Sequence, residues 1–155
     1  MGSRKRKPAL ESYTLVASIR SIEQSYSISE ERSYRRVDDE AVLLLKGAIE
    51  RISTRYNRHH GKEIEIQLLC ARSFDRDHPS APVEKPFLMS VSFRGAVAGV
   101  GAYLPSDAFW ALADMIKSKE VNLVEIDFSS SRYGFAELLN LNFAPAQNLR
   151  PPDQI

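Results

Sequence analysis

The sequence is short of cysteine and of long apolar runs. Its one cysteine, Cys70, excludes both an intramolecular disulfide and a zinc site made of several thiolates. The longest apolar run without glycine, Ala41 to Leu45, is far below the roughly 18 residues of a membrane-spanning helix. The basic residues Arg4 to Lys7 precede no apolar segment, so we expect no secretory signal. These absences predict a cytoplasmic protein without a membrane partner.

Signatures of covalent catalysis and of nucleotide binding are also missing. The chain has no G-x-S-x-G sequence, and its glycines between Gly95 and Gly101 match neither G-x-G-x-x-G nor a phosphate-binding loop. Cys70 alternates in phase with Ile66 and Leu68, which favours a small buried side chain over a reactive thiolate. We therefore expect no cofactor, and the sequence favours a protein that is not an enzyme.

Composition and length predict one soluble domain. Hydrophobic residues make up 43% and charged residues 26% of the chain, which is typical of a soluble globular protein. A chain of 155 residues has the size of one domain. We expect a flexible basic arm at 1–12, a single β-rich domain at 13–144 and a loose, proline-rich tail at 145–155.

Alternation of apolar and polar side chains predicts a mainly β fold. The clearest example runs from Ile64 to Cys70, where apolar residues occupy every second position. For 41–52 a helix is the competing interpretation. The predicted strands are 13–28, 41–52, 64–70, 87–93, 96–104, 124–128 and 139–143. Short connections between several of them favour an antiparallel β-sandwich or barrel-like domain of about seven strands with one α-helix.

The sequence also predicts local features of three regions: a phase change in the first strand, the connection at 30–40, and the inward faces of the fourth and seventh strands. The apolar phase changes near Arg20, which indicates a β-bulge or a strand that crosses between sheets. Residues 30–40 carry many charges of both signs and are expected to form a solvated connection. The inward-facing residues of the fourth and seventh strands are predicted to be Phe87, Met89, Val91 and Phe93, and Leu139, Leu141 and Phe143.

The one predicted helix spans about 106–117. Ser106 suits the N-cap and Asp107 suits the positive end of the helix dipole. Trp110 falls at the margin of the apolar stripe, and because interfaces favour tryptophan it is the candidate interface residue. The expected stripe comprises Phe109, Leu112, Met115 and Ile116.

The strongest binding candidate is the basic segment 51–62, which contains no acidic residue. Guanidinium and ammonium groups bind oxyanions, and an interleaved aromatic ring can stack on a base. With the basic arm, the segment predicts a nucleic-acid or other polyanion partner, while a solvated turn is the competing interpretation. The candidate anion-binding residues are Arg51, Arg55, Tyr56, Arg58, His59, His60 and Lys62.

A metal site is the other chemical candidate. Asp75, Asp77 and His78 offer two carboxylates and an imidazole, a set that suits a hard cation or non-heme iron, although a polar turn is the favoured interpretation. Carboxylate pairs that share a strand face are interpreted as solvated sheet surface rather than as acid-base groups. These pairs are Glu63 with Glu65 and Glu125 with Asp127.

The leading functional hypothesis is a non-enzymatic binding or assembly protein that associates with itself or with a protein partner. It depends on the missing catalytic motifs, and on the strand edges and apolar helix surface that an open sandwich exposes. One alternative is a polyanion-binding module that uses the basic segment and the basic arm. The other is a metal-dependent enzyme that uses Asp75, Asp77 and His78.

Overall fold

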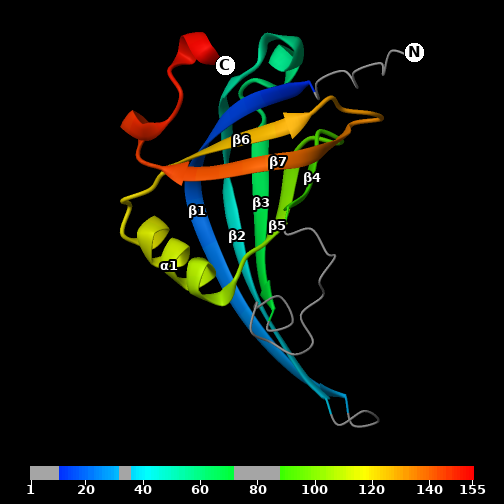
Figure 1. Ribbon diagram of the computed structural model, residues 1–155, viewed down its shortest axis with the longest axis vertical. Helices are drawn as coiled ribbons and strands as arrows, with labels where there is room; N and C mark the ends of the chain where they lie inside the picture. Colours follow the sequence, from blue (N-terminus) through cyan, green and yellow to red (C-terminus); the bar gives the residue numbers. More distant parts are fainter. Residues whose placement is uncertain (1–10, 32–35, 72–87) are drawn as a thin grey trace, which may run out of the picture.

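The structure is a computed structural model that describes residues 11–31, 36–71 and 88–155. Within these ranges the chain forms a closed seven-stranded β-barrel with one short α-helix (Figure 1). The strand order around the barrel is β1-β2-β3-β5-β4-β7-β6. The elements are β1 (Ser12–Glu31), β2 (Arg36–Ile52), β3 (Glu63–Ala71), β4 (Leu88–Ser92), β5 (Ala98–Tyr103), α1 (Ser106–Lys117), β6 (Leu123–Ser129) and β7 (Phe135–Ala144).

The mainly β, barrel-like fold class is confirmed, and the barrel is mixed rather than wholly antiparallel. Among the described strands, β3 and β5 pair in parallel, from Ile64↔Ala98 to Leu69↔Tyr103. The other neighbouring strands pair antiparallel. β5 lies between β3 and β4 in the barrel; it runs parallel to β3 and antiparallel to β4. Side-chain alternation does not specify this order.

β1 and β2 form one long antiparallel hairpin. Their pairing extends from Leu15↔Ile52 to Glu31↔Arg36. The expected solvated connection at 30–40 is therefore wrong at 30–31 and 36–40, where both strands continue. Backbone pairing does not require apolar side chains, so a dense mixture of charges does not end a strand. The helix alternative for 41–52 is excluded, because β2 occupies that range.

A β-bulge divides β1 near Arg20, as the change of apolar phase predicts. The register with β2 shifts between Ile19 and Ser21. Gly47 pairs with Ile19, and a Cβ atom at Gly47 would lie 1.6 Å from the Ser18 carbonyl oxygen. Glycine is thus required where the two backbones approach so closely.

A second bulge corrects the prediction for β4. The register with β5 shifts between Leu88 and Ser90, so Leu88 packs against the core while Met89 is 46% exposed. The inward position predicted for Met89 is therefore wrong. One inserted residue turns the adjacent side chains to the opposite face. The inward positions Val91 and Phe93 are confirmed, and Phe87 lies outside the described residues.

A third irregularity has the same effect in β7. The register between β6 and β7 shifts within the hairpin, and Leu138 is buried in place of the predicted Leu139. Beyond the shift the predicted phase holds in part, because Leu141 and Phe143 are half-buried and pack against the core. Bulges thus account for the errors in both strands.

The helix α1 spans Ser106–Lys117, close to its predicted range. Ser106 is its first helical residue and not the N-cap, which is Pro105 and makes no side-chain capping bond. The buried residues of α1 are Phe109, Ala113 and Ile116. Met115, expected in the stripe, is 38% exposed, because Ala113 lies one turn from Phe109 and takes the central place.

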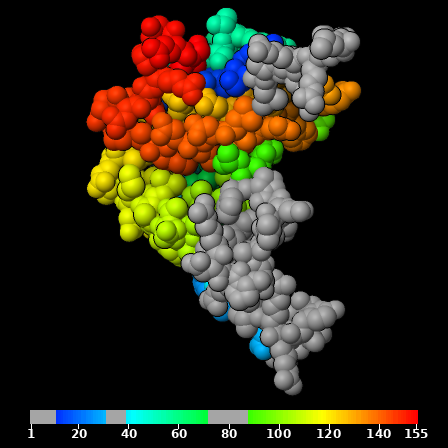
Figure 2. Space-filling view, in the orientation of Figure 1, coloured from blue at the N-terminus to red at the C-terminus, as the bar shows by residue number. Residues whose placement is uncertain are grey.

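The core is largely aliphatic and includes an aromatic cluster of Tyr56, Phe93 and Phe128. Phe109 of α1 and Phe128 of β6 are its largest fully buried side chains. Figure 2 shows α1 and β7 on the same face of the molecule, with the C-terminal residues against β7. In the described part of the chain no helix is long and apolar enough to cross a membrane.

The faces of β3 give a test of the core. Ile66 is 1% exposed, so Ile66→Asp buries an unpaired charge and is expected to lower the free energy of unfolding by about 3 kcal/mol or more. Gln67 is exposed on the same strand. Gln67→Lys is the control, with an expected change within about 0.5 kcal/mol. Chemical denaturation measures both, and equal effects would contradict the assigned faces.

Candidate functional site

The basic segment 51–62 folds around a short 3₁₀ helix, η1 (Thr54–His59), between β2 and β3. Several of its cations bind the chain itself. Arg51 donates a hydrogen bond to the Arg150 carbonyl oxygen at 3.0 Å, and Lys62 Nζ donates to the Phe93 carbonyl oxygen at 2.9 Å. These two side chains therefore have internal hydrogen-bond acceptors.

Tyr56 lies inside the barrel rather than on its surface. It is 4% exposed, and its ring contacts Tyr13, Phe93 and Phe128 at centroid distances of 4.9, 5.6 and 5.0 Å. Its hydroxyl oxygen accepts a hydrogen bond from the Ser131 N–H at 2.9 Å. The neighbouring rings cover the ring of Tyr56, and Tyr56 thereby anchors η1 in the core.

His59 is the second anchor of η1. It is 8% exposed and stacks on Phe93 with the ring centroids 4.6 Å apart. Its Nε2 accepts a hydrogen bond from Arg58 Nε at 3.1 Å. Burial, together with the positive charges of Lys62 and Arg58, lowers the pKa of His59 below its ordinary value. His59 is therefore held as the neutral imidazole.

The remaining candidates of the basic segment lie on the surface. Arg55 and Arg58 are exposed, and His60 is exposed beside them. The Arg55 guanidinium lies over the Tyr13 ring, 5.4 Å from its centroid, and bonds the Tyr13 hydroxyl at 2.6 Å. The basic arm lies outside the described residues as far as residue 10. Anion binding by the basic segment stays a prediction.

The predicted metal ligands lie outside the described residues. They are Asp75, Asp77 and His78, within the undescribed range 72–87. Among the residues that the structure does describe, no three His, Cys, Asp or Glu side chains gather as a metal site would require. The metal-dependent enzyme therefore stays a hypothesis from the sequence.

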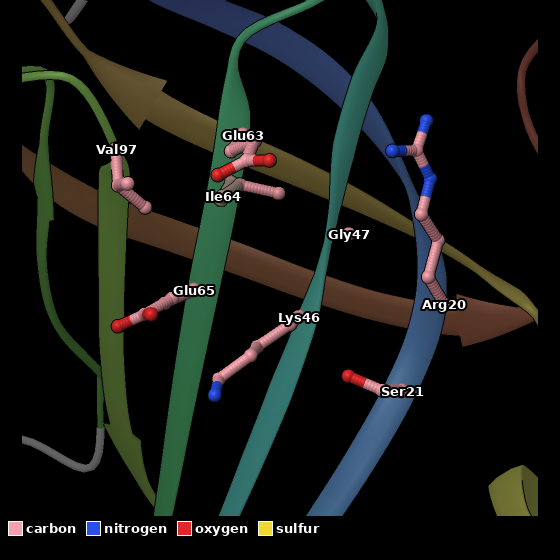
Figure 3. A pocket seen from close by; sticks show the side chains of 8 residues that line it. All are labelled: Arg20, Ser21, Lys46, Gly47, Glu63, Ile64, Glu65 and Val97. Carbon is pink, nitrogen blue, oxygen red and sulfur yellow. The ribbon is translucent and has the colours of Figure 1, made fainter.

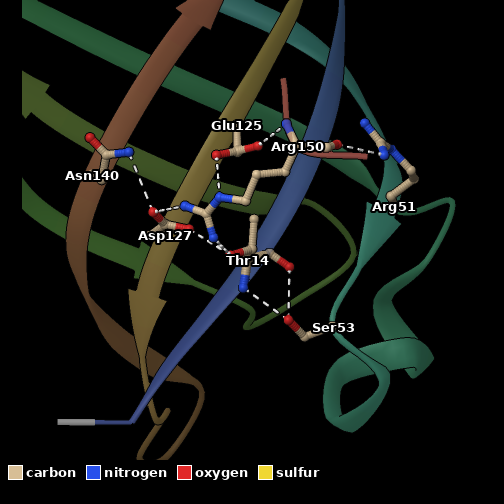
Figure 4. Close-up of polar contacts among 7 residues, drawn as sticks. All are labelled: Thr14, Arg51, Ser53, Glu125, Asp127, Asn140 and Arg150. Atoms are coloured by element: carbon tan, nitrogen blue, oxygen red, sulfur yellow. Dashed lines mark hydrogen bonds and ion pairs between the residues drawn. The ribbon is translucent and has the colours of Figure 1, made fainter. Parts of the chain in front are cut away.

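A partly buried ionic network, which the sequence does not reveal, joins β1, β6 and the C-terminal segment (Figure 4). The Arg150 guanidinium lies 3.0 Å from Glu125 Oε1 and 2.6 Å from Asp127 Oδ2, and donates to Thr14 Oγ1 at 3.0 Å. Thr14 Oγ1 in turn donates to Asp127 Oδ1 at 2.6 Å. The arginine thus forms ion pairs with two neighbouring carboxylates.

This network corrects the interpretation of Glu125 as a solvated residue. Glu125 is 3% exposed, because the C-terminal segment covers the outer face of β6. Leu149, next to Arg150, is buried against Val16 and Ala144. The sequence predicts a loose segment at 145–155, and Leu149 and Arg150 make these contacts within it. Since both carboxylates are paired with one guanidinium, we interpret the arrangement as structural rather than as an acid-base pair. We call Arg150 with its partners Thr14, Glu125 and Asp127 the Arg150 clamp.

The outer face of the barrel also holds a hollow of about 230 Å³ near the β1 bulge (Figure 3). Its lining includes cations and carboxylates in equal number: Arg20, Lys46, Glu63 and Glu65. Lys46 Nζ bonds Glu23 at 2.8 Å, and its pKa is raised chiefly by this hydrogen bond. Charges of opposite sign offset one another here, so the hollow favours no charged ligand.

Comparison of the chain with protein-family models, curated proteins and solved structures finds no match. Function is therefore inferred from the geometry of this chain alone. Two surfaces that combine exposure with apolar or aromatic side chains are the projecting part of the β1–β2 hairpin and the turn between β6 and β7.

The ionic network predicts a coupled loss of stability. Arg150→Met leaves the buried Glu125 carboxylate without its cation and is expected to cost about 2 kcal/mol of unfolding free energy. The double variant Arg150→Met/Glu125→Gln should lose less than the sum of the single variants, because the buried side chain at position 125 then carries no unpaired charge. Arg20→Met, which removes an exposed pair with Glu50, is the control, with a change of about 0.5 kcal/mol or less. Additive single effects would contradict the network.

His59 predicts a pH dependence of stability. Because the folded protein lowers the pKa of His59, the unfolded chain takes up the proton more readily. Stability should therefore fall as the pH drops below about 6.5, the ordinary histidine value. His59→Phe keeps the stacking on Phe93 and should weaken this dependence, whereas the exposed His60→Gln should not. Denaturation midpoints at pH 5.5 and 7.5 test this, and an unchanged difference in His59→Phe would contradict it.

Proposed function

We propose that the protein is a non-catalytic binding protein that self-associates through the projecting part of its β1–β2 hairpin. The observation that carries this proposal is the extent of β1. Its pairing with β6 stops at Ser18, while its pairing with β2 continues to Glu31. We call residues 20–31 of β1 the projecting edge; Figure 1 shows this part of the hairpin extending beyond the barrel.

The projecting edge has the properties of a strand that pairs with another chain. No described strand pairs with β1 on its β6 side beyond Ser18. β2 also pairs with β3 as far as Glu40, so only the last part of the projecting edge, from Ile28 on, belongs to a two-stranded hairpin. An edge strand is a template for further pairing, and a two-stranded hairpin is only marginally stable in water. A strand from a second molecule would therefore extend the sheet and stabilise the end of the hairpin.

Apolar side chains on the projecting edge support the same conclusion. Tyr26 is 57% and Ile28 65% exposed. Tyr26 pairs with Ala41, which is buried, so the two residues belong to the face that continues the barrel interior. Surface of this kind along an open strand favours a protein partner.

The pattern of residues favours a second copy of the chain as that partner. In an antiparallel pair of projecting edges with Ser25 on the twofold axis, Ile22 lies opposite Ile28 of the other copy. Apolar residues thus meet apolar residues, as stable cross-strand pairs require.

Cysteine cross-linking tests this register. Ser25→Cys should form a disulfide-linked dimer under mild oxidation, because residues opposite each other on antiparallel strands have Cα atoms about 5 Å apart. Ser27→Cys lies on the same face but would be about 13 Å from its counterpart, and should not cross-link. The native Cys70 is buried, which makes the wild-type chain a suitable blank. Equal cross-linking of both variants would contradict the register.

Sedimentation tests the association itself. Wild-type protein should dissociate on dilution, and Tyr26→Lys/Ile28→Lys should be monomeric because it places charges on the paired face. Trp110→Lys addresses the helix surface that the sequence suggests, where Trp110 is 44% exposed. It should leave association unchanged. A wild-type monomer at all concentrations, or dissociation by Trp110→Lys alone, would overturn the proposal.

A further inference from the structure

The turn between β6 and β7 contains an aromatic residue in a conformation that aromatic residues rarely adopt. Backbone hydrogen bonds join Arg132 and Phe135 in both directions, at 2.7 and 2.9 Å. The two residues between them, Tyr133 and Gly134, have φ angles of 52° and 84°. Tight hairpin turns with two positive φ angles favour Asn-Gly or Asp-Gly, and a bulky residue at the first position is an outlier.

Packing does not account for Tyr133. Its side chain is 91% exposed, so no contact within the described chain offsets the unfavourable backbone conformation. A strained residue that presents its side chain to solvent points to a role in binding. The question is then which ligand an exposed phenol ring at this place fits.

The neighbours of Tyr133 are aromatic and cationic. The Arg94 guanidinium lies 5.1 Å from the centroid of the Phe135 ring, and Phe135 is 46% exposed. Arg94 also reaches the turn itself, since its Cγ lies 2.7 Å from where a Cβ of Gly134 would be. A guanidinium that stacks by its face keeps its N–H groups free at the edge for oxyanions. Arg132 adds a second exposed cation.

A hollow of about 580 Å³ adjoins these residues, between the turn and β4. Met89 and Phe135 supply its apolar surface, while Ser90 and Ser130 supply hydroxyl groups. Glu137 also lines it and can accept a hydrogen bond from an exocyclic amine. This volume is within the range of pockets that take small organic ligands, such as one nucleobase.

From this geometry we infer that the β6–β7 turn binds single-stranded nucleic acid. Tyr133 and Phe135 stack on unpaired bases, and the guanidinium groups of Arg94 and Arg132 bind phosphate oxygens. Only a single strand exposes the faces of its bases to such rings, so duplex DNA is a poorer ligand. The site lies apart from the projecting edge and does not depend on self-association.

Fluorescence anisotropy with labelled 12-nucleotide oligo(dT) and oligo(U) tests this inference. Tyr133→Asn should weaken binding about fivefold or more, because it removes one stacking ring. The same substitution should raise the thermal midpoint, because asparagine suits the turn better. Arg94→Gln and Arg132→Gln should each reduce the slope of log K against log salt by about 0.7.

Two control variants distinguish this site from the other aromatic and cationic surfaces of the chain. Trp110→Asn removes an exposed aromatic residue on α1 and should leave the affinity unchanged. The triple variant Arg51→Gln/Arg55→Gln/Arg58→Gln removes the three arginines of the basic segment and should also retain most of the affinity. Affinity that is unchanged in Tyr133→Asn, or lost only in the triple variant, overturns the inference. Absence of oligonucleotide binding at low salt, or binding only to vesicles containing phosphatidylserine, overturns it as well.

Discussion

The seam between β1 and β6 is the constraint on which the rest of the structure depends. Seven residues of β1, from Ser12 to Ser18, pair with β6 and close the barrel. The Arg150 clamp lies across this seam, because Thr14 and Asp127 are cross-strand partners and both bind its guanidinium. The C-terminal segment is therefore part of the closure. Without Arg150, the charge of the buried Glu125 carboxylate on β6 would be unpaired, and this would oppose closure of the barrel.

The seam also fixes where the barrel stops and the hairpin begins to project. The bulge between Ile19 and Ser21 follows directly after the last pair with β6. Gly47 permits the close backbone approach at that point. Beyond it β1 is paired with β2 alone, which separates a closed, clamped end from an open one. The two proposed binding surfaces differ in chemistry: one is a strand edge with exposed apolar side chains, and the other combines aromatic and guanidinium groups.

Regular strands were predictable from the sequence, whereas their irregularities were not. The alternation from Ile64 to Cys70 matches β3 because each residue there keeps its face. In β4 one inserted residue sends Met89 outward, and no composition signal marks that insertion. The Arg150 clamp joins residues up to 136 positions apart, a relation that periodicity cannot express. Tyr133 had a readable signal, because a Tyr-Gly pair between two strands implies a positive φ at tyrosine.

The basic segment shows that an alternation of rings and cations does not reveal which of the side chains are exposed. Tyr56 and His59 are three positions apart in a 3₁₀ helix, so both face the barrel. They complete the aromatic cluster of the core with Phe93 and Phe128. The intervening Asn57 and Arg58 are exposed. The alternation therefore arises because the rings of η1 face the core while its arginines face solvent. A base can stack only on an exposed ring, and among these tyrosines that is Tyr133 and not Tyr56.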